Sequence, residues 1–312
     1  MMNTFIRVAE IWVPDSDGYL LEFGGGVYDN APEFGAVSRS MCFGRGEGLP
    51  GRVWEEGIPI ILKDLQGSYF QRAAAAKAAQ LTCAIAFPVF VADRLTAVVV
   101  LFCGHAGEHS GAIELWRNDP RVTTDMTLRD GVYGAGDAAF EAASRQTFLP
   151  RGSGLPGLAW QRQGSVFIDG LSESARFLRS EEAAGTRLRS GFAIPCPAAT
   201  NENYVLAFLS STSIPIAALL ESWTAGDDGQ PAPRAVGPTA TDGPPGAALA
   251  VTDVSETITE VLSRGVPKVR SLRAANPPGR STPRVTGAGL RSLVAIPVVS
   301  DGGVVEAIAL YF

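Results

Sequence analysis

The sequence predicts an α+β protein of three tandem domains, each an antiparallel β-sheet of five to six strands with flanking helices. Two observations carry this prediction. One pattern of residues recurs three times, and its markers Trp12, Trp116 and Trp223 are 104 and 107 residues apart. Within each copy, short apolar runs typical of strands alternate with helical stretches. The repeat therefore divides the 312 residues into three units, where length alone suggests two.

The first two copies match most closely. Residues 45–54 (RGEGLPGRVW) correspond to residues 151–160 (RGSGLPGLAW), without gaps back to Ser38 and Ser144. The third copy lacks this motif but keeps LVAIP at 293–297, which corresponds to GFAIP in the second. The predicted boundaries are a first domain at 1–104, a short linker at 105–112, a second domain at 113–212 and a divergent third domain at 213–312.

The first half of each unit is expected to contain a hairpin and a helix. In the first copy, residues 12–20 indicate two strands joined by a turn at Asp17-Gly18. A short helix is expected to open at Gly48, because Pro50 is tolerated in a first turn where its missing N–H costs nothing. Gly57 is expected to end it.

The second half is expected to contain a strand, a helix and a strand pair. Residues 58–65 indicate a strand, and the alanine-rich stretch 69–80 favours a helix. The apolar runs 82–91 and 95–103 predict two antiparallel strands, because only three residues separate them. This order gives an antiparallel sheet with helices rather than a parallel βαβ fold.

The third unit differs from the others in charge and in one segment. Residues 226–246 are rich in proline and glycine, which favours a long hairpin loop or a flexible insert. Between 261 and 300 there are seven cations and no acid, so the rest of the chain carries −13 against an overall −6. This stretch is a candidate anion or partner patch or a solvated loop, and its members are Arg264, Lys268, Arg270, Arg273, Arg280, Arg284 and Arg291.

Composition excludes several classes of protein. With 46% hydrophobic and 19% charged residues the chain is globular, and its longest apolar run, 95–103, is too short to span a membrane. No leader pattern occurs at the start, so a cytoplasmic location is expected. The overall charge of −6 gives no reason to expect a nucleic-acid or membrane partner. The cysteines are scattered without CxxC spacing, so reduced thiols are expected: Cys42, Cys83, Cys103 and Cys196.

The chain resembles the GAF domain family over residues 9–210. The resemblance rests on GEGLPGRVWEEGIPI at 46–60, Asp64, Phe70 and the apolar strands 84–102, and in the second copy on GLPG at 154–157 with Trp160, Asp169, Phe177 and AIP at 193–195. It implies a mostly antiparallel sheet and a role in small-molecule sensing or dimerisation rather than catalysis. The long helices that commonly relay signals in this family are missing, and no heptads occur, so a partner or an oligomeric contact would have to transmit any signal.

The resemblance also implies where a small molecule would bind, between the sheet and the segment that joins the third strand to the fourth. In the first copy this segment is alanine-rich, and in the second it is charged. The alternative is that both segments are surface helices without a ligand. The candidate ligand-binding residues are Asp64, Tyr69, Phe70, Arg72, Thr82, Cys83, Asp169, Arg176, Phe177, Arg179, Glu181, Arg189 and Ser190.

The residues give little support for nucleotide binding, bilin attachment, metal binding or catalysis. The set that accompanies nucleotide-binding members of the family is not recovered, and no cysteine adjoins a histidine as bilin attachment requires. The only histidines, His105 and His109, lie in a glycine-rich stretch that favours a linker over a metal or pH-responsive site. No catalytic residue and no metal site is therefore expected, and the cofactor is unknown.

The sequence thus favours a non-catalytic sensory or regulatory protein whose GAF-like domains bind a small molecule, mediate oligomerisation, or do both. The expected partners are a small-molecule ligand and a second copy or another protein. The alternative is a structural scaffold whose pockets are filled by side chains, and an enzyme of unknown reaction stands third. The charged segment of the second copy favours sensing, whereas the alanine-rich first copy favours the scaffold.

Overall fold

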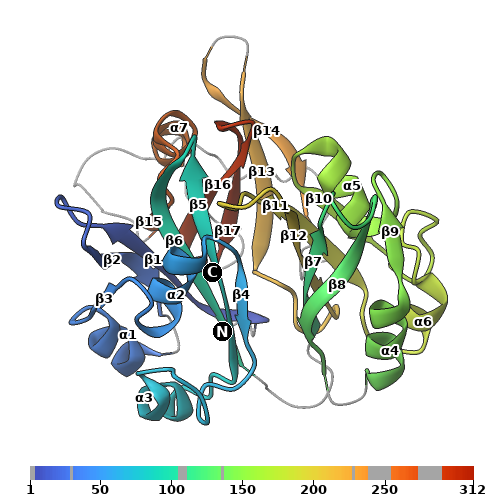
Figure 1. Cartoon of the computed structure of the whole chain (residues 1–312), viewed down its shortest axis with the longest axis horizontal. Coiled ribbons are helices and arrows are strands. Elements are labelled where there is room, and N and C mark those ends of the chain that lie inside the picture. Colours follow the sequence, from blue (N-terminus) through green and yellow to red (C-terminus); the bar gives the residue numbers. More distant parts are fainter. Residues whose placement is uncertain are drawn as a thin grey trace, which may run out of the picture.

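The chain forms three antiparallel sheets in succession, two of six strands and one of five, each with its own helices (Figure 1). This arrangement confirms the predicted α+β class. We call the three sheets with their helices domain 1, domain 2 and domain 3. The computed structural model describes residues 4–28, 31–104, 111–134, 137–226, 229–237, 254–272 and 290–312.

Domain 1 has the strand order β3-β2-β1-β6-β5-β4. The predicted Asp-Gly turn is present, and the carboxylate of Asp15 accepts a hydrogen bond from the backbone of Tyr19 across it (2.8 Å). The elements are β1 (Ile6–Pro14), β2 (Leu20–Val27), α1 (Pro32–Ser38), β3 (Cys42–Gly44), α2 (Gly48–Glu56), β4 (Ile60–Leu62), α3 (Ala73–Ala78), β5 (Cys83–Val91) and β6 (Arg94–Cys103).

Domain 2 repeats this order as β9-β8-β7-β12-β11-β10. Its elements are β7 (Gly111–Asn118), β8 (Asp125–Val132), α4 (Ala138–Gln146), β9 (Phe148–Pro150), α5 (Gly154–Arg162), β10 (Val166–Asp169), α6 (Ser180–Ala184), β11 (Ser190–Cys196) and β12 (Asn203–Ser210). Residues 105–110 of the predicted linker lie outside the described residues, and β7 begins at Gly111.

Domain 3 has the order β14-β13-β17-β16-β15. A strand, β14, occupies residues 231–236 of the proline- and glycine-rich segment and pairs with β13, whereas residues 227–228 and 238–246 lie outside the described residues. The elements are β13 (Leu219–Ala225), β14 (Pro231–Val236), α7 (Ser255–Arg264), β15 (Lys268–Ser271), β16 (Ser292–Ser300) and β17 (Gly303–Tyr311).

Three features of domain 1 differ from the prediction. The helix α1 and the three-residue strand β3 were not expected, because elements this short show no usable periodicity. The predicted helix at 69–80 begins only at Ala73, because the preceding residues form a loop that carries Phe70 and Arg72 into the interior.

The shared GLPG motif forms the start of a helix, as predicted. A Cβ atom on Gly51 would lie 2.0 Å from the backbone oxygen of Gly44, so only glycine lets α2 approach β3 this closely. The equivalent helices α2, α5 and α7 each end in a left-handed residue, at Gly57, Gln163 and Gly265.

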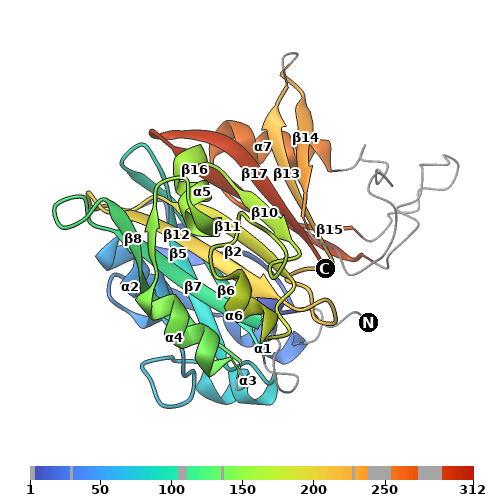
Figure 2. The ribbon, with the colours of Figure 1, turned by 90° about the vertical axis from the view of Figure 1, so that its right-hand side faces the viewer.

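The middle strands of the three sheets meet at the centre of the molecule, and the helices lie towards its periphery (Figures 1 and 2). Along β5, Ile85 and Phe87 face this junction, whereas Ala84 and Ala86 face the helices of their own domain. β11 and β16 alternate in the same way. Both faces of these strands are buried, and this explains their continuous apolar runs.

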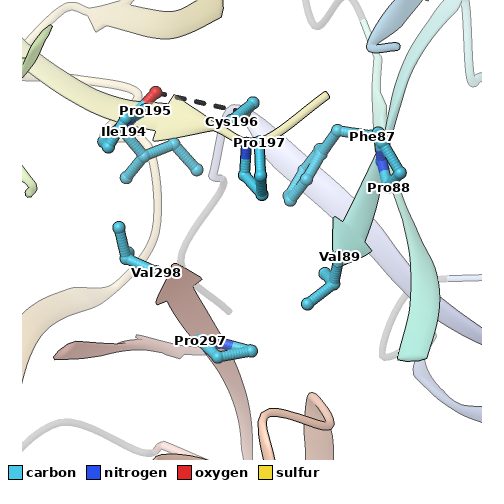
Figure 3. Close-up of a pocket in the computed structure, with 9 residues that line it drawn as sticks. All are labelled: Phe87, Pro88, Val89, Ile194, Pro195, Cys196, Pro197, Pro297 and Val298. Carbon is cyan, nitrogen blue, oxygen red and sulfur yellow. Dashed lines mark hydrogen bonds between the residues drawn. The ribbon is translucent and has the colours of Figure 1, made fainter. Parts of the chain in front are cut away.

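Proline occupies the same repeat position in all three central strands, at Pro88, Pro195 and Pro297. Figure 3 shows side chains from the three sheets turned towards one another around a small apolar pocket at this junction. The pocket is lined by Phe87, Pro88, Val89, Ile194, Pro195, Cys196, Pro197, Pro297 and Val298.

The domain contacts close into a ring with an approximate threefold repeat. The backbone oxygen of Gly57 in domain 1 accepts a hydrogen bond from Ala199 in domain 2 (2.8 Å). The Gln163 side chain in domain 2 accepts one from Ser300 in domain 3 (3.2 Å). The oxygen of Gly265 in domain 3 accepts one from Thr96 in domain 1 (2.8 Å). Each helix end thus contacts the central hairpin of the next domain.

Candidate functional site

The same carboxylate stands on the first strand of each domain. Glu10, Glu114 and Glu221 lie two residues before the repeated tryptophan. Because side chains in a strand alternate between faces, the carboxylate and the indole point to the same side of the sheet. In all three domains the tryptophan Nε1 donates a hydrogen bond to Oε2 of the carboxylate, at 2.9–3.1 Å. The sheet therefore presents an acidic group to the helix side of every domain.

In domain 1 this carboxylate binds a buried arginine. Arg72 immediately precedes α3, and its two terminal nitrogens donate to the two oxygens of Glu10 at 2.5 and 2.9 Å. Ser38 of α1 accepts a further hydrogen bond from Arg72, and the Tyr28 hydroxyl donates to Glu10 (2.9 Å). Both charged side chains are almost fully buried, at 1% and 0% exposure. The bidentate pair is thus satisfied entirely within the protein.

Aromatic rings enclose the same guanidinium. Five ring centroids lie between 4.7 and 6.0 Å from its central carbon. These distances suit cation–π attraction, which strengthens when water is excluded. The rings belong to Trp12, Phe34, Phe43, Phe70 and Phe102.

Domain 2 repeats the assembly with its own residues. Arg179 immediately precedes α6, donates to both oxygens of Glu114, and donates to Ser144 of α4. Tyr133 donates to the same carboxylate (2.9 Å). The rings of Trp116, Phe140 and Phe177 lie 4.7–5.1 Å from the guanidinium.

Electrostatics favours the charged form of the Glu114 carboxyl. Burial by itself would raise the pKa of Glu114, but the charge and hydrogen bonds of Arg179, together with those of Trp116 and Tyr133, outweigh it and lower the pKa. Burial next to a carboxylate raises the pKa of Tyr28 and Tyr133, so both phenols stay protonated as donors. The carboxylate, the guanidinium and the phenol of each assembly are thus paired with one another within the protein.

Domain 3 keeps the carboxylate but surrounds it differently. Glu221 accepts hydrogen bonds from Trp223 (3.1 Å) and from Tyr311 of β17 (2.6 Å), both at Oε2. By strand register, Tyr311 stands where Phe102 stands in domain 1. Among the described residues no cation lies against Glu221, and burial raises the pKa of this carboxyl.

The candidate residues of the first copy fall into separate environments. Phe70 and Arg72 belong to the buried assembly, whereas Cys83 lies in the junction between domains. Asp64 is exposed, and its carboxylate accepts hydrogen bonds from the backbone of the following turn. Tyr69 is half-buried under the guanidinium of Arg52, and Thr82 bonds to the backbone of Cys103.

The candidates of the second copy divide in the same way. Phe177 and Arg179 belong to the buried assembly. Three others lie together: the exposed Asp169 accepts a hydrogen bond from the buried Ser190 (2.9 Å), and the exposed Arg189 lies 3.7 Å from the same carboxylate. Arg176 and Glu181 are exposed.

The basic stretch is partly neutralised by α7. Lys268 and Arg264 lie 3.0 and 3.4 Å from Glu260, and Arg270 donates to Thr257 (3.0 Å). Arg291 is exposed. The predicted patch residues Arg273, Arg280 and Arg284 lie outside the described residues.

The buried thiols have shifted pKa values, and the hydrogen bond with Cys103 lowers the pKa of Cys83. His105 and His109 lie outside the described residues, and within the described ranges no three His, Cys, Asp or Glu side chains group together. Burial raises the pKa of the Cys103 and Cys196 thiols, and this disfavours the reactive thiolate. None of the described helices is long and apolar enough to cross a bilayer.

The sequence prediction missed the acidic half of the assembly. Glu10, Glu114 and Glu221 were visible as the first residue of the repeated Glu-x-Trp, yet they marked only where each copy begins. Tyr28 and Ser38 likewise recur in the second copy, at Tyr133 and Ser144. A polar residue that recurs within an otherwise apolar strand is the signal that could have identified these partners.

A family model for the GAF domain matches residues 2–117, which contain β1 to β6 and most of β7. This segment is similar to the GAF domain family. Domain 2 has the same strand order, and domain 3 shares five of its strand positions. No curated protein matches the chain.

Solved structures resemble one GAF-sized part of the chain. The nlh2 GAF domain of A. aeolicus in an inactive state is 19% identical, over 33% of this chain and 60% of that one, with a TM-score of 0.27. NreA of Staphylococcus aureus, mutated in its nitrate-binding site, is 14% identical over 32% and 74%, with a TM-score of 0.27. Free methionine-R-sulfoxide reductase of Neisseria meningitidis is 19% identical over 32% and 52%, with a TM-score of 0.25. The chain thus spans less than two thirds of the first and third of these proteins.

Proposed function

We propose that this protein is a non-catalytic regulatory protein that acts through contacts with other proteins, and that domains 1 and 2 carry an internal ligand, their own arginine. One observation carries the proposal. Arg72 and Arg179 each lie between a buried carboxylate and a set of aromatic rings. A guanidinium so placed satisfies the groups that an external ligand would otherwise use.

The regulatory part of the proposal rests on the GAF match, because GAF domains are a sensory and regulatory family. The protein-contact part rests on the buried ion pairs of domains 1 and 2, whose charged groups are satisfied within the chain. The sheet faces that point to the junction pack against one another, so they are not available to bind another protein.

A ligand screen tests the proposal directly. Native mass spectrometry of the purified protein should give the mass of the chain alone, and a panel of nucleotides and anionic metabolites should leave its melting temperature unchanged. A retained or stabilising compound whose effect disappears in Phe70→Leu or Phe177→Leu would place an external ligand in these domains and overturn the proposal.

A chemical rescue tests the internal ligand. Arg179→Ala leaves the carboxylate of Glu114 and its aromatic rings without their cation, and added methylguanidinium should refill that position. We expect methylguanidinium to raise the melting temperature of Arg179→Ala by more than that of Arg176→Ala, which removes an exposed arginine from the same loop. Equal responses of the two variants would count against the internal-ligand role.

A further inference from the structure

Two cysteines of domain 1 lie directly opposite each other on neighbouring strands. Cys83 is the first residue of β5, Cys103 is the last residue of β6, and the antiparallel register pairs them. Opposed residues in such a ladder have Cα atoms about 4.5–5.5 Å apart, within the range of about 4.4–6.8 Å that a disulfide spans. Both side chains belong to the buried cluster at the junction of the three sheets, so they point to the same face. A disulfide can therefore form here without a large movement of the backbone.

The corresponding positions in domain 2 carry oxygen in place of sulfur. There the register pairs Ser190 with Ser210, at the start of β11 and the end of β12. The repeat thus places two small polar side chains face to face at this level of the sheet, and domain 1 uses thiols for both. Serine at either position is compatible with the fold, because domain 2 is built that way.

The other two cysteines are not opposed to a thiol. Cys42 on β3 lies opposite Glu22, and Cys196 on β11 lies opposite Tyr204. Cys42 is exposed, whereas Cys196 is buried. The chain therefore offers two built-in comparisons for the opposed pair, one exposed thiol and one buried thiol.

The two opposed thiols differ in acidity. The hydrogen bond with Cys103 lowers the pKa of Cys83 against the effect of burial, and a hydrogen bond with Thr82 adds to this. Burial raises the pKa of Cys103 well above its usual range. The thiolate is the form of cysteine that attacks an oxidant. Cys83 is thus suited to react first, and Cys103 to react with the product.

The pair lies where domain 1 meets the chain that joins domains 2 and 3. On the other side of Cys103, strand register places Ile6 of β1. The backbone N–H groups of Phe5 and Ile6 donate to the backbone oxygens of Pro215 and Ile216, at 2.7 and 3.1 Å. A covalent bond between β5 and β6 would therefore form beside an interdomain contact.

We infer that Cys83 and Cys103 form a reversible disulfide when the protein meets a peroxide, so that domain 1 carries a redox-responsive modification site. The inference goes beyond the proposed function, because it concerns a covalent change and not a protein contact or an internal arginine. Its tests leave Arg72 and Arg179 untouched, so the two proposals can fail separately.

The chemistry needs one hydrogen peroxide for each disulfide. The Cys83 thiolate attacks one peroxide oxygen, the O–O bond breaks, and the other oxygen leaves as hydroxide, which takes up the proton that the thiol had lost. Cys103 Sγ then attacks the sulfur of the resulting sulfenic acid, and the hydroxyl leaves as water with the Cys103 proton. Two thiols are oxidised to one disulfide, and the peroxide is reduced to two waters.

The experiment uses the full-length protein with Cys42→Ser, which removes the exposed thiol. The reduced protein is treated with hydrogen peroxide, unfolded and alkylated, and its thiols are counted by mass spectrometry. We expect two of the three remaining thiols to be lost, a linked peptide pair to contain Cys83 and Cys103, and dithiothreitol to restore both thiols. Cys196→Ala, added to this variant, should leave the yield of the disulfide unchanged.

Single serine variants separate the roles of the two thiols. In Cys103→Ser the reaction should stop at the sulfenic acid of Cys83, which dimedone labels. In Cys83→Ser we expect dimedone labelling to be at least about tenfold slower, because Cys103 is the weaker acid.

Three results would overturn the inference. One is retention of all three thiols under peroxide that oxidises Cys42 in the natural protein. Another is a linked peptide in which Cys196 replaces either member of the pair. The third is a disulfide that forms only after the protein has been unfolded in urea, because the folded strands would then not bring the thiols together.

Discussion

Domains 1 and 3 present the same carboxylate on the same strand, yet only domain 1 pairs it with a described cation. In domain 1 Glu10 is locked by Arg72, and the surrounding rings are packed onto the guanidinium. In domain 3 Glu221 is held by two neutral donors, and burial raises its pKa. The comparison teaches that the acidic residue belongs to the repeated fold, whereas the described side chains that surround it differ between these two domains.

The largest effect is expected when Arg72 is removed from domain 1. Arg72→Met leaves Glu10 buried without its cation, and loss of one partner of a buried pair costs about 3–5 kcal/mol. Urea unfolding should show this loss of stability. Lys77→Met, an exposed change in the adjacent helix α3, should stay within about 0.5 kcal/mol. Similar values for the two variants would mean that the pair does not stabilise domain 1.

The second prediction concerns how domain 3 is held against domain 1. Gly265 is left-handed (φ 63°), and a Cβ there would lie 2.3 Å from Val91 of domain 1. Gly265→Ala should therefore cost about 2–4 kcal/mol, combining backbone strain with an interdomain clash. Gly18→Ala has a similar backbone (φ 74°) with nothing within 4 Å, and should cost only about 1–2 kcal/mol. Equal losses would show that the contact between these domains is loose.

A smaller effect is expected in the pH dependence of stability, which should differ in sign between Glu221 and Glu114. A glutamate whose folded pKa lies above its unfolded value makes the protein less stable as pH rises through that window, which starts near pH 4.3. Glu221→Gln removes this penalty. The free energy of unfolding of the variant should therefore rise relative to that of the natural protein as pH increases, by no more than about 1 kcal/mol at neutral pH. Glu114 should behave oppositely, because its lowered pKa gives stability that is lost as pH falls.

Thermal unfolding of the natural protein and Glu221→Gln across this pH range provides the measurement, with Glu256→Gln as the exposed control. If Glu221→Gln instead lost stability relative to the natural protein as pH rose, Glu221 would have a cationic partner, and the contrast with domain 1 would disappear.

The smallest effect is expected at the surface contact between domains 1 and 2. Lys63 and Asp130 lie 2.5 Å apart, but their side chains are 46% and 32% exposed. Lys63→Gln should change the free energy of unfolding by less than about 1 kcal/mol, and the difference should fade with added salt. A larger, salt-independent loss would show that this ion pair, rather than the apolar junction, fixes the neighbouring domain.

Much of the fold could be predicted from the sequence because the repeat aligns strand with strand. Trp12, Trp116 and Trp223 located the three copies, and Gly48 and Gly57 located a helix start and end. Short elements such as β3 could not be found, since three residues carry no periodicity. The meeting of the three sheets was also hidden, because a strand buried on both faces looks the same whichever partner covers it.

The candidate site was predicted only in part, and for a specific reason. Arg72 and Phe70 were singled out because the resemblance implies a ligand near the segment that joins the third predicted strand to the fourth, and they do lie together. Their partner Glu10 is 62 residues away along the chain, and no local pattern links the two. Pairings over such separations come from the topology of the sheet.

The closed ring of domains has a consequence for how this protein could have changed over time. In a trimer of identical subunits, every substitution appears three times, so a residue cannot be lost from one site and kept in the others. With the three copies joined in one chain, each position on the ring is encoded separately. Domain 3 could therefore acquire Tyr311 at the position of Phe102 while Arg72 and Arg179 stayed in place, and the other two copies could continue to support the third.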